Sequence, residues 1–219
     1  MIIRITSLLL AVFFLLIFFV SSRFSYKHRF NETYSMRNRF PFEFNYNGRF
    51  SDNFYGNSGI ILSIFASFFF LIFFDTTYSN GLIIASMICG IICFMMIGVL
   101  AFLPMKLFKL HFIFASLFFA SIFLLSGFSA IAFYQHYQLT EKVLSLVCFF
   151  VGLFLTLATF VLLMNPKLTR PIKGVEKENE NGEKVMVRPK YIVLAFTEWL
   201  LIIIAFLDLI NMFLFSTSI

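Results

Sequence analysis

The stretch AFTEWLLIIIAFLDLINMF, Ala195 to Phe213, has the length and apolarity of a helix that crosses a membrane, yet it contains Glu198 and Asp208. A bilayer core about 30 Å thick requires about 20 apolar residues per helix. A carboxylate at that depth costs about 3 kcal/mol on insertion scales, so it indicates a function or a buried partner. Residues ten apart project about 80° from each other on a helix and share one broad stripe. We expect that stripe to face the interior of a helical bundle.

The whole chain has the composition of an integral membrane protein. Its 219 residues are 60% hydrophobic and 13% charged, whereas soluble domains have about 45–50% apolar and about 25% charged residues. The net charge is +6, but the basic residues lie in short segments between apolar runs. That distribution suits lipid headgroups and argues against a nucleic-acid partner.

The apolar runs predict an all-α membrane protein, with one domain over residues 1–219. The first run is interpreted as a retained span, because it is longer than a typical signal-peptide core. The predicted fold is a bundle of six transmembrane helices, at about 2–20, 59–74, 81–103, 107–133, 143–164 and 191–215.

Two loops, 21–58 and 165–190, carry signals for a small β element. Loop one contains aromatic residues that alternate with polar ones and lead into Asn47-Gly48, a strong hairpin signal. Loop five contains Asn181-Gly182 between two runs with β-branched residues. We expect β structure that caps one face of the bundle; a disordered aromatic loop is the alternative. The alternating aromatic residues of loop one are Phe40, Phe42, Phe44 and Tyr46.

Charge predicts the orientation. Of the 17 lysines and arginines, Arg4 and Lys142 fall on the side of the even loops. The rest fall in or beside loop one, loop three (Pro104–Lys106) and loop five. The positive-inside rule then places the odd loops in the cytoplasm and both termini outside. Asn31 begins an Asn-Glu-Thr triplet, a candidate glycosylation site that has meaning only if loop one faces a lumen.

The intramembrane polar residues form two candidate groups. His111 follows loop three and Glu198 follows loop five, so both lie in the same leaflet, and Trp199 is next to Glu198. A His111–Glu198 pair is either a structural hydrogen bond between helices or the polar end of a cavity for a lipid headgroup or a proton. Asp208 and Asn211 lie one turn apart in the opposite leaflet. An acid that reaches the headgroups is the alternative to a buried partner. The candidate partners at the even-loop face are Gln135, His136, Thr140, Lys142 and Asp75.

Enzyme motifs are absent from the sequence. It contains no HExxH, GxSxG or GxxxxGK[ST]. Its three histidines are scattered between loop one and both ends of the fourth span, which argues against a shared metal. We therefore assign no catalytic residue, metal or cofactor, and expect a protein that is not an enzyme.

Several positions resemble one family. The residues are YGNSGIIL (Tyr55–Leu62) at the second span, Gly98, Pro104 and His111 around loop three, Ala115, and Glu198-Trp199 in the last span. With six spans and a long first loop, the chain resembles the DRAM/FRAG family of six-span membrane proteins and its uncharacterised prokaryotic relatives. The resemblance implies a six-helix bundle and a role in membrane-lipid or GPI-anchor biology or in autophagy. It also implies odd loops outside the cytoplasm, which conflicts with the charge rule.

Three functions remain open at this level. The first is a non-enzymatic protein that binds or senses membrane lipid through a polar cavity at His111, Glu198 and Trp199. The second is a structural or accessory subunit of a larger membrane complex, in which the aromatic residues of loop one dock another subunit. The third is a membrane lipid hydrolase, which requires a serine within hydrogen-bond reach of His111.

Overall fold

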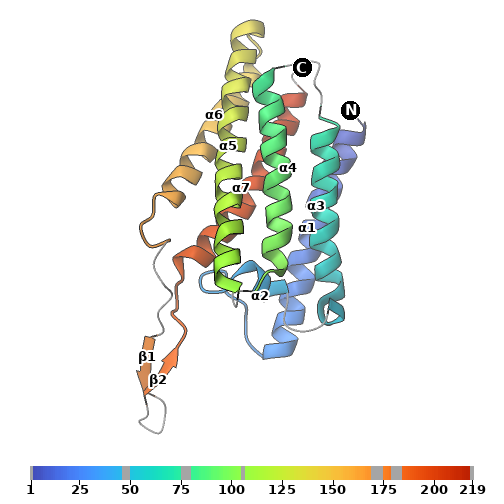
Figure 1. Ribbon diagram of the computed structural model, residues 1–219. Helices are drawn as coiled ribbons and strands as arrows, with labels where there is room; N and C mark the ends of the chain where they lie inside the picture. Colours follow the sequence, from blue (N-terminus) through green and yellow to red (C-terminus); the bar gives the residue numbers. More distant parts are fainter. Residues whose placement is uncertain are drawn as a thin grey trace.

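The computed structural model describes residues 2–45, 50–74, 80–104, 107–168, 175–178 and 184–217. It is an all-helical bundle with one hairpin, and six of its helices are long and apolar enough to cross a membrane (Figure 1). The elements are α1 (Ile2–Phe30), α2 (Pro41–Asn45), the 3-10 helix η1 (Phe50–Asn53), α3 (Phe54–Ile72), α4 (Gly81–Phe102), α5 (Phe108–Thr140), α6 (Val143–Leu163), β1 (Val175–Glu178), β2 (Lys184–Val187) and α7 (Val193–Ser216).

The prediction of six membrane-spanning helices in an α-helical bundle is therefore confirmed. The helix ends differ from the predicted spans, most at α1, which continues to Phe30, and at α5, which continues to Thr140. Hydropathy reports where a helix crosses lipid, whereas a helix continues into the headgroup region wherever its backbone hydrogen bonds persist. The α1 extension turns part of the predicted loop one into helix.

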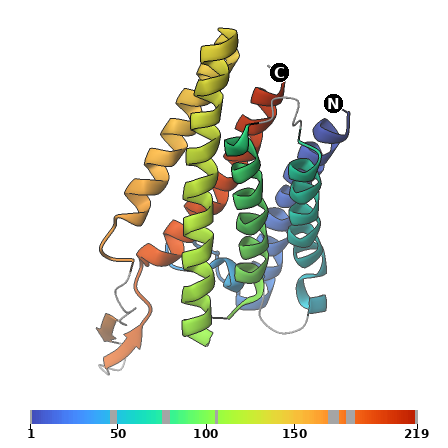
Figure 2. The ribbon, with the colours of Figure 1, turned by 45° about the horizontal axis from the view of Figure 1, so that its top comes forward.

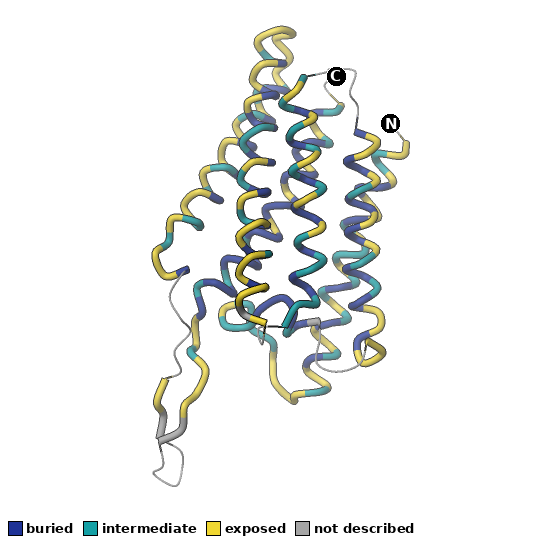
Figure 3. The backbone as a smooth tube through the Cα atoms, viewed as in Figure 1, coloured by how far each residue is buried: buried dark blue, intermediate teal, exposed yellow. Residues whose placement is uncertain are grey.

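The last helix lies at the centre of the bundle. In the most apolar 18-residue stretch of α7, 67% of the residues are buried, against 22% in the corresponding stretches of α1 and α6. It packs against α1, α2, α4, α5 and α6. Figure 3 shows exposed residues along the outer helices and the projecting hairpin, and buried ones inside the bundle. The predicted inward stripe of α7 is therefore the core of the fold.

Loop five forms the predicted hairpin. Strands β1 and β2 pair antiparallel, with Val175 opposite Val187 and Glu178 opposite Lys184. The turn residues Asn181-Gly182 lie outside the described residues. Figures 1 and 2 show the hairpin projecting away from the helices, so it does not cap the bundle as expected.

The strand expected in loop one is wrong, because the segment forms the helix α2. Pro41 occupies its first position, where a missing N–H and a fixed φ favour a helix. The Glu43 side chain accepts a hydrogen bond from the Phe40 backbone N–H at 2.7 Å, which caps the turn. These local signals outweigh the alternation of aromatic residues. Tyr46 and Asn47-Gly48 lie outside the described residues.

Helices α1 and α3 approach each other closely at Gly59. A Cβ added there would lie 2.9 Å from the backbone O of Phe14 and from the backbone N of Phe18. Near this contact the Ser63 hydroxyl donates to the backbone O of Ala11 at 2.7 Å. Small residues that let backbones approach are a common device of membrane helix pairs.

We predict that Gly59→Ala destabilises the protein by about 1–3 kcal/mol, because the added methyl group must push two backbones apart. The measurement is thermal unfolding in detergent. Gly127→Ala on α5 is the matched control, since its Cβ meets only the Thr156 methyl group at 3.8 Å. Equal melting temperatures for the two variants would contradict the prediction.

Candidate functional site

The structure brings His111 and Glu198 together. His111 lies in the first turn of α5 and Glu198 in the first turns of α7. The Nε2 atom of His111 lies 2.9 Å from Oε1 of Glu198, and both side chains are fully buried. The pair joins the two helices at the end of the bundle where loops one, three and five meet.

Hydrogen bonding fixes the number of protons on this pair. The Nδ1 atom of His111 lies 3.2 Å from the backbone O of Leu103. A carbonyl can only accept, so Nδ1 carries a proton. The Nε2–Oε1 contact then needs one more proton between its two atoms, which gives either a neutral pair or an imidazolium–carboxylate pair. Its net charge is zero in both cases, which lowers the cost of burying it.

The aromatic residues of loop one cover the pair. The rings of Phe40 and Phe42 meet His111 edge-on, with centroids 5.6 and 6.1 Å away. Phe44 packs against Trp199 instead, at 5.5 Å. Their exposed fractions are 1%, 9% and 2% for Phe40, Phe42 and Phe44. The exposed apolar face expected for docking another subunit is therefore absent from these three residues.

Trp199 attaches the same loop to α7. Its Nε1–H lies 3.0 Å from the Tyr34 hydroxyl and 3.0 Å from the backbone O of Arg39. Tyr34 in turn donates to the backbone O of Phe40 at 2.9 Å. Burial raises the pKa of Tyr34 well above the usual phenol value, so it remains a donor at neutral pH. Trp199 is buried and bonded to protein, which differs from the headgroup anchor usual for tryptophan in membranes.

An ion pair fastens loop one to loop five. The Arg188 guanidinium donates two hydrogen bonds to the Glu43 carboxylate, at 2.5 and 2.8 Å. The backbone N–H of Ile192 also donates to the backbone O of Arg37, at 2.8 Å. Bidentate arginine–carboxylate pairs combine strength with fixed geometry. Together these contacts hold α2 over the His111–Glu198 pair.

The second polar group has other partners than expected. The Ser126 hydroxyl of α5 donates to Oδ2 of Asp208 at 2.5 Å, and both residues are buried. The amide of Asn211 donates to the backbone O of Cys148 on α6 at 3.0 Å. His136, expected as a candidate partner, instead bonds to the Ser145 hydroxyl at 2.8 Å. Asp208 and Asn211 thus tie α7 to α5 and α6 inside the bundle, and they do not reach the headgroups.

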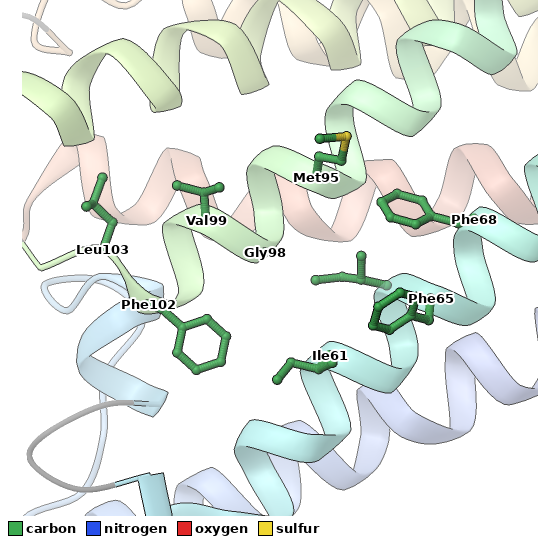
Figure 4. Close-up of a pocket in the computed structure, with 9 residues that line it drawn as sticks. Ile61, Phe65, Phe68, Met95, Gly98, Val99, Phe102 and Leu103 are labelled. Carbon is green, nitrogen blue, oxygen red and sulfur yellow. The ribbon is translucent and has the colours of Figure 1, made fainter.

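An apolar groove runs between α3 and α4 (Figure 4). Its volume is about 570 Å³. Phe65 and Met95 are half exposed at its opening, whereas Ile64 is buried. The groove reaches Leu103, whose backbone O is the acceptor for His111. The lining residues are Ile61, Ile64, Phe65, Phe68, Met95, Gly98, Val99, Phe102 and Leu103.

The groove was not predicted from the sequence, because its presence depends on which helices pack side by side. Gly98 leaves room at the groove, since a Cβ there would lie 3.1 Å from Ile64 Cδ1. His111 and Glu198 do not line the groove. The groove is apolar and ends at Leu103, beside the buried polar pair. The polar cavity at His111, Glu198 and Trp199 stays a prediction.

The described residues offer no centre for hydrolysis at His111. Its two ring nitrogens face Glu198 and Leu103, and no serine of the described ranges bonds to either. No group of histidine, cysteine or acidic side chains within the same ranges is arranged to hold a metal ion.

Comparisons with protein-family models, curated proteins and solved structures give no match. The geometry of the chain itself must therefore carry the functional argument, and the resemblance to the DRAM/FRAG family stays a prediction.

We predict that Glu198→Ala costs about 3–5 kcal/mol, because it leaves His111 buried without its acidic partner. His111→Ala combined with Glu198→Ala should cost less than the sum of the two single changes. Unfolding in detergent measures both effects. Glu176→Ala, which changes an exposed acid on β1, is the control and should cost less than about 1 kcal/mol. Additive costs in the double variant would contradict the pairing.

Proposed function

We propose that this membrane protein binds a membrane lipid, whose acyl chain lies in the groove between α3 and α4. The observation that carries the proposal is the groove itself, an apolar hollow on two membrane-spanning helices with a half-exposed opening. Ligand pockets of about 300–1,000 Å³ are typical of small-molecule sites, and the groove falls in that range.

Packing would provide the selectivity of this site. Lipid tails are as apolar as the groove, so the hydrophobic effect contributes little inside a bilayer, and shape complementarity decides which chain stays bound. The groove ends at Leu103, and the exposed Lys109 begins the next helix at the same end. A lysine there would favour an anionic headgroup.

His111 and Glu198 would then serve as positioning residues for the lipid. Through Leu103 the pair ties the end of α4 to α5 and α7. An acyl chain that pushes α3 away from α4 would strain α4 at the end that this pair holds in place. The protein would sense the occupied groove through that strain. The implied lipid role of the DRAM/FRAG family agrees with this function.

We also propose that the odd loops, with α2 and the hairpin, face the cytoplasm. The support is the distribution of basic residues, of which Arg4 and Lys142 alone fall at the other end. In the opposite orientation, implied by the family resemblance, Asn31 would be open to glycosylation.

We predict that Gly98→Leu abolishes lipid retention, because the new side chain fills the groove from α4. Native mass spectrometry of the detergent-purified protein counts bound lipids. Wild type should retain one lipid, and Gly98→Leu should retain at least tenfold less, a loss of about 1.4 kcal/mol in binding. Gly127→Leu is the glycine-to-leucine control on a different helix. Lipid retained equally by all three proteins, or by none, would overturn the proposal.

We predict that Thr33→Cys is protected from a membrane-impermeant thiol reagent added to intact cells, whereas Glu141→Cys is labelled. The two positions are exposed and lie at opposite ends of the bundle. The native thiols of Cys93 and Cys148 are buried, whereas Cys89 on α4 is partly exposed, so both variants are made in a Cys89→Ala background. The reverse labelling pattern would support the orientation of the family.

A further inference from the structure

Asp208 lacks the kind of partner that Glu198 has. Its Oδ2 accepts from the Ser126 hydroxyl, and its Oδ1 has no hydrogen-bond partner within the described residues. No ion pair joins Asp208 to a lysine, arginine or histidine in the same part of the chain. The residue is fully buried on the central helix, where an ionised carboxylate without a compensating cation is strongly disfavoured.

A second unpaired oxygen lies one turn along α7. Asn211 uses its amide nitrogen on the backbone O of Cys148, and its Oδ1 has no partner among the residues described. Residues three apart are neighbours on one face of a helix. Two acceptor oxygens cannot satisfy each other unless a hydrogen lies between them. A proton on Oδ1 of Asp208 supplies that hydrogen, either directly or through one water.

We propose that Asp208 and Ser126 form an intramembrane proton-binding site, with the proton on Oδ1 of Asp208. The Ser126 hydroxyl orients the acid by donating to Oδ2, and Asn211 Oδ1 accepts the acid proton. Uptake converts the carboxylate to a neutral carboxylic acid with a proton taken from water. The site is independent of lipid binding in the α3–α4 groove.

Few titratable groups surround the site. Cys93 on α4 interacts electrostatically with Asp208, and Cys148 on α6 lies beside Asn211 through its carbonyl. His136 on α5 is ten residues beyond Ser126, about 15 Å along the helix, and bonds to Ser145. Asp208 itself therefore holds the proton, and these neighbouring groups do not.

Infrared spectroscopy of the purified protein at pH 7 tests the proposal. Wild type should show the C=O band of a protonated carboxylic acid, and Asp208→Asn should lose the contribution of Asp208 to it. A contribution of Glu198, if its pair with His111 is neutral, should stay in Asp208→Asn. Ser126→Ala should keep the band but shift it, because the acid loses the hydroxyl on Oδ2. Glu176→Gln, which changes an exposed acid on β1, should leave the band unchanged. This set remains informative if Asp208→Asn folds poorly.

The pH dependence of unfolding gives a second measurement. Around neutral pH the folded state holds the Asp208 proton, which the unfolded chain releases, so this site alone makes the unfolding constant rise about tenfold per pH unit. The His111–Glu198 pair, with zero net charge, adds a slope of its own, so Asp208→Asn should lower the wild-type slope by about one proton. An acid band unchanged in Asp208→Asn would overturn the proposal. The proposal would also be overturned if wild type lacked this band and its melting temperature rose with the sodium concentration. That result would indicate a bound cation in place of the proton.

Discussion

The fold depends on the need to satisfy two carboxyl groups on one membrane-spanning helix. Lipid offers no hydrogen bond, so Glu198 and Asp208 are stable only where other helices supply partners. This places α7 in the centre, against α1, α2, α4, α5 and α6. The partners come from α5 in both cases, His111 near one end and Ser126 farther along. Helix α5 is thus fixed to α7 at two depths.

The two buried carboxyl groups are stabilised in different ways. Glu198 pairs with a base and forms a unit of zero net charge, covered by the rings of loop one. Asp208 meets a neutral hydroxyl. Each acid leaves one buried oxygen without a hydrogen-bond partner among the described residues, Oε2 of Glu198 and Oδ1 of Asp208. A paired acid is a rigid connection, whereas an acid with a neutral partner responds to its surroundings.

Much of the architecture was predictable because hydropathy and the bilayer together determine it. The six spans, the hairpin of loop five and the inward stripe of α7 follow from local patterns. That His111 and Glu198 share a leaflet follows from counting spans. Other features depend on contacts between distant residues. The bond of Arg188 to Glu43 joins residues far apart in sequence, and the α3–α4 groove depends on how two helices pack. Alternating aromatic residues in loop one favoured a strand, and only the cap by Glu43 and the burial of the rings reveal a helix.

The contacts of loop one also constrain how the protein is made. Loop one leaves the ribosome well before the groups that hold it, Arg188 and Trp199, are synthesised. Until α7 enters the membrane, His111 has no acid to pair with and Tyr34 has no indole to bind. The first five spans must therefore wait as an incomplete assembly, with an aromatic segment at the membrane surface. Insertion of α7 supplies Glu198 and Trp199 together and so completes both sets of contacts in one step.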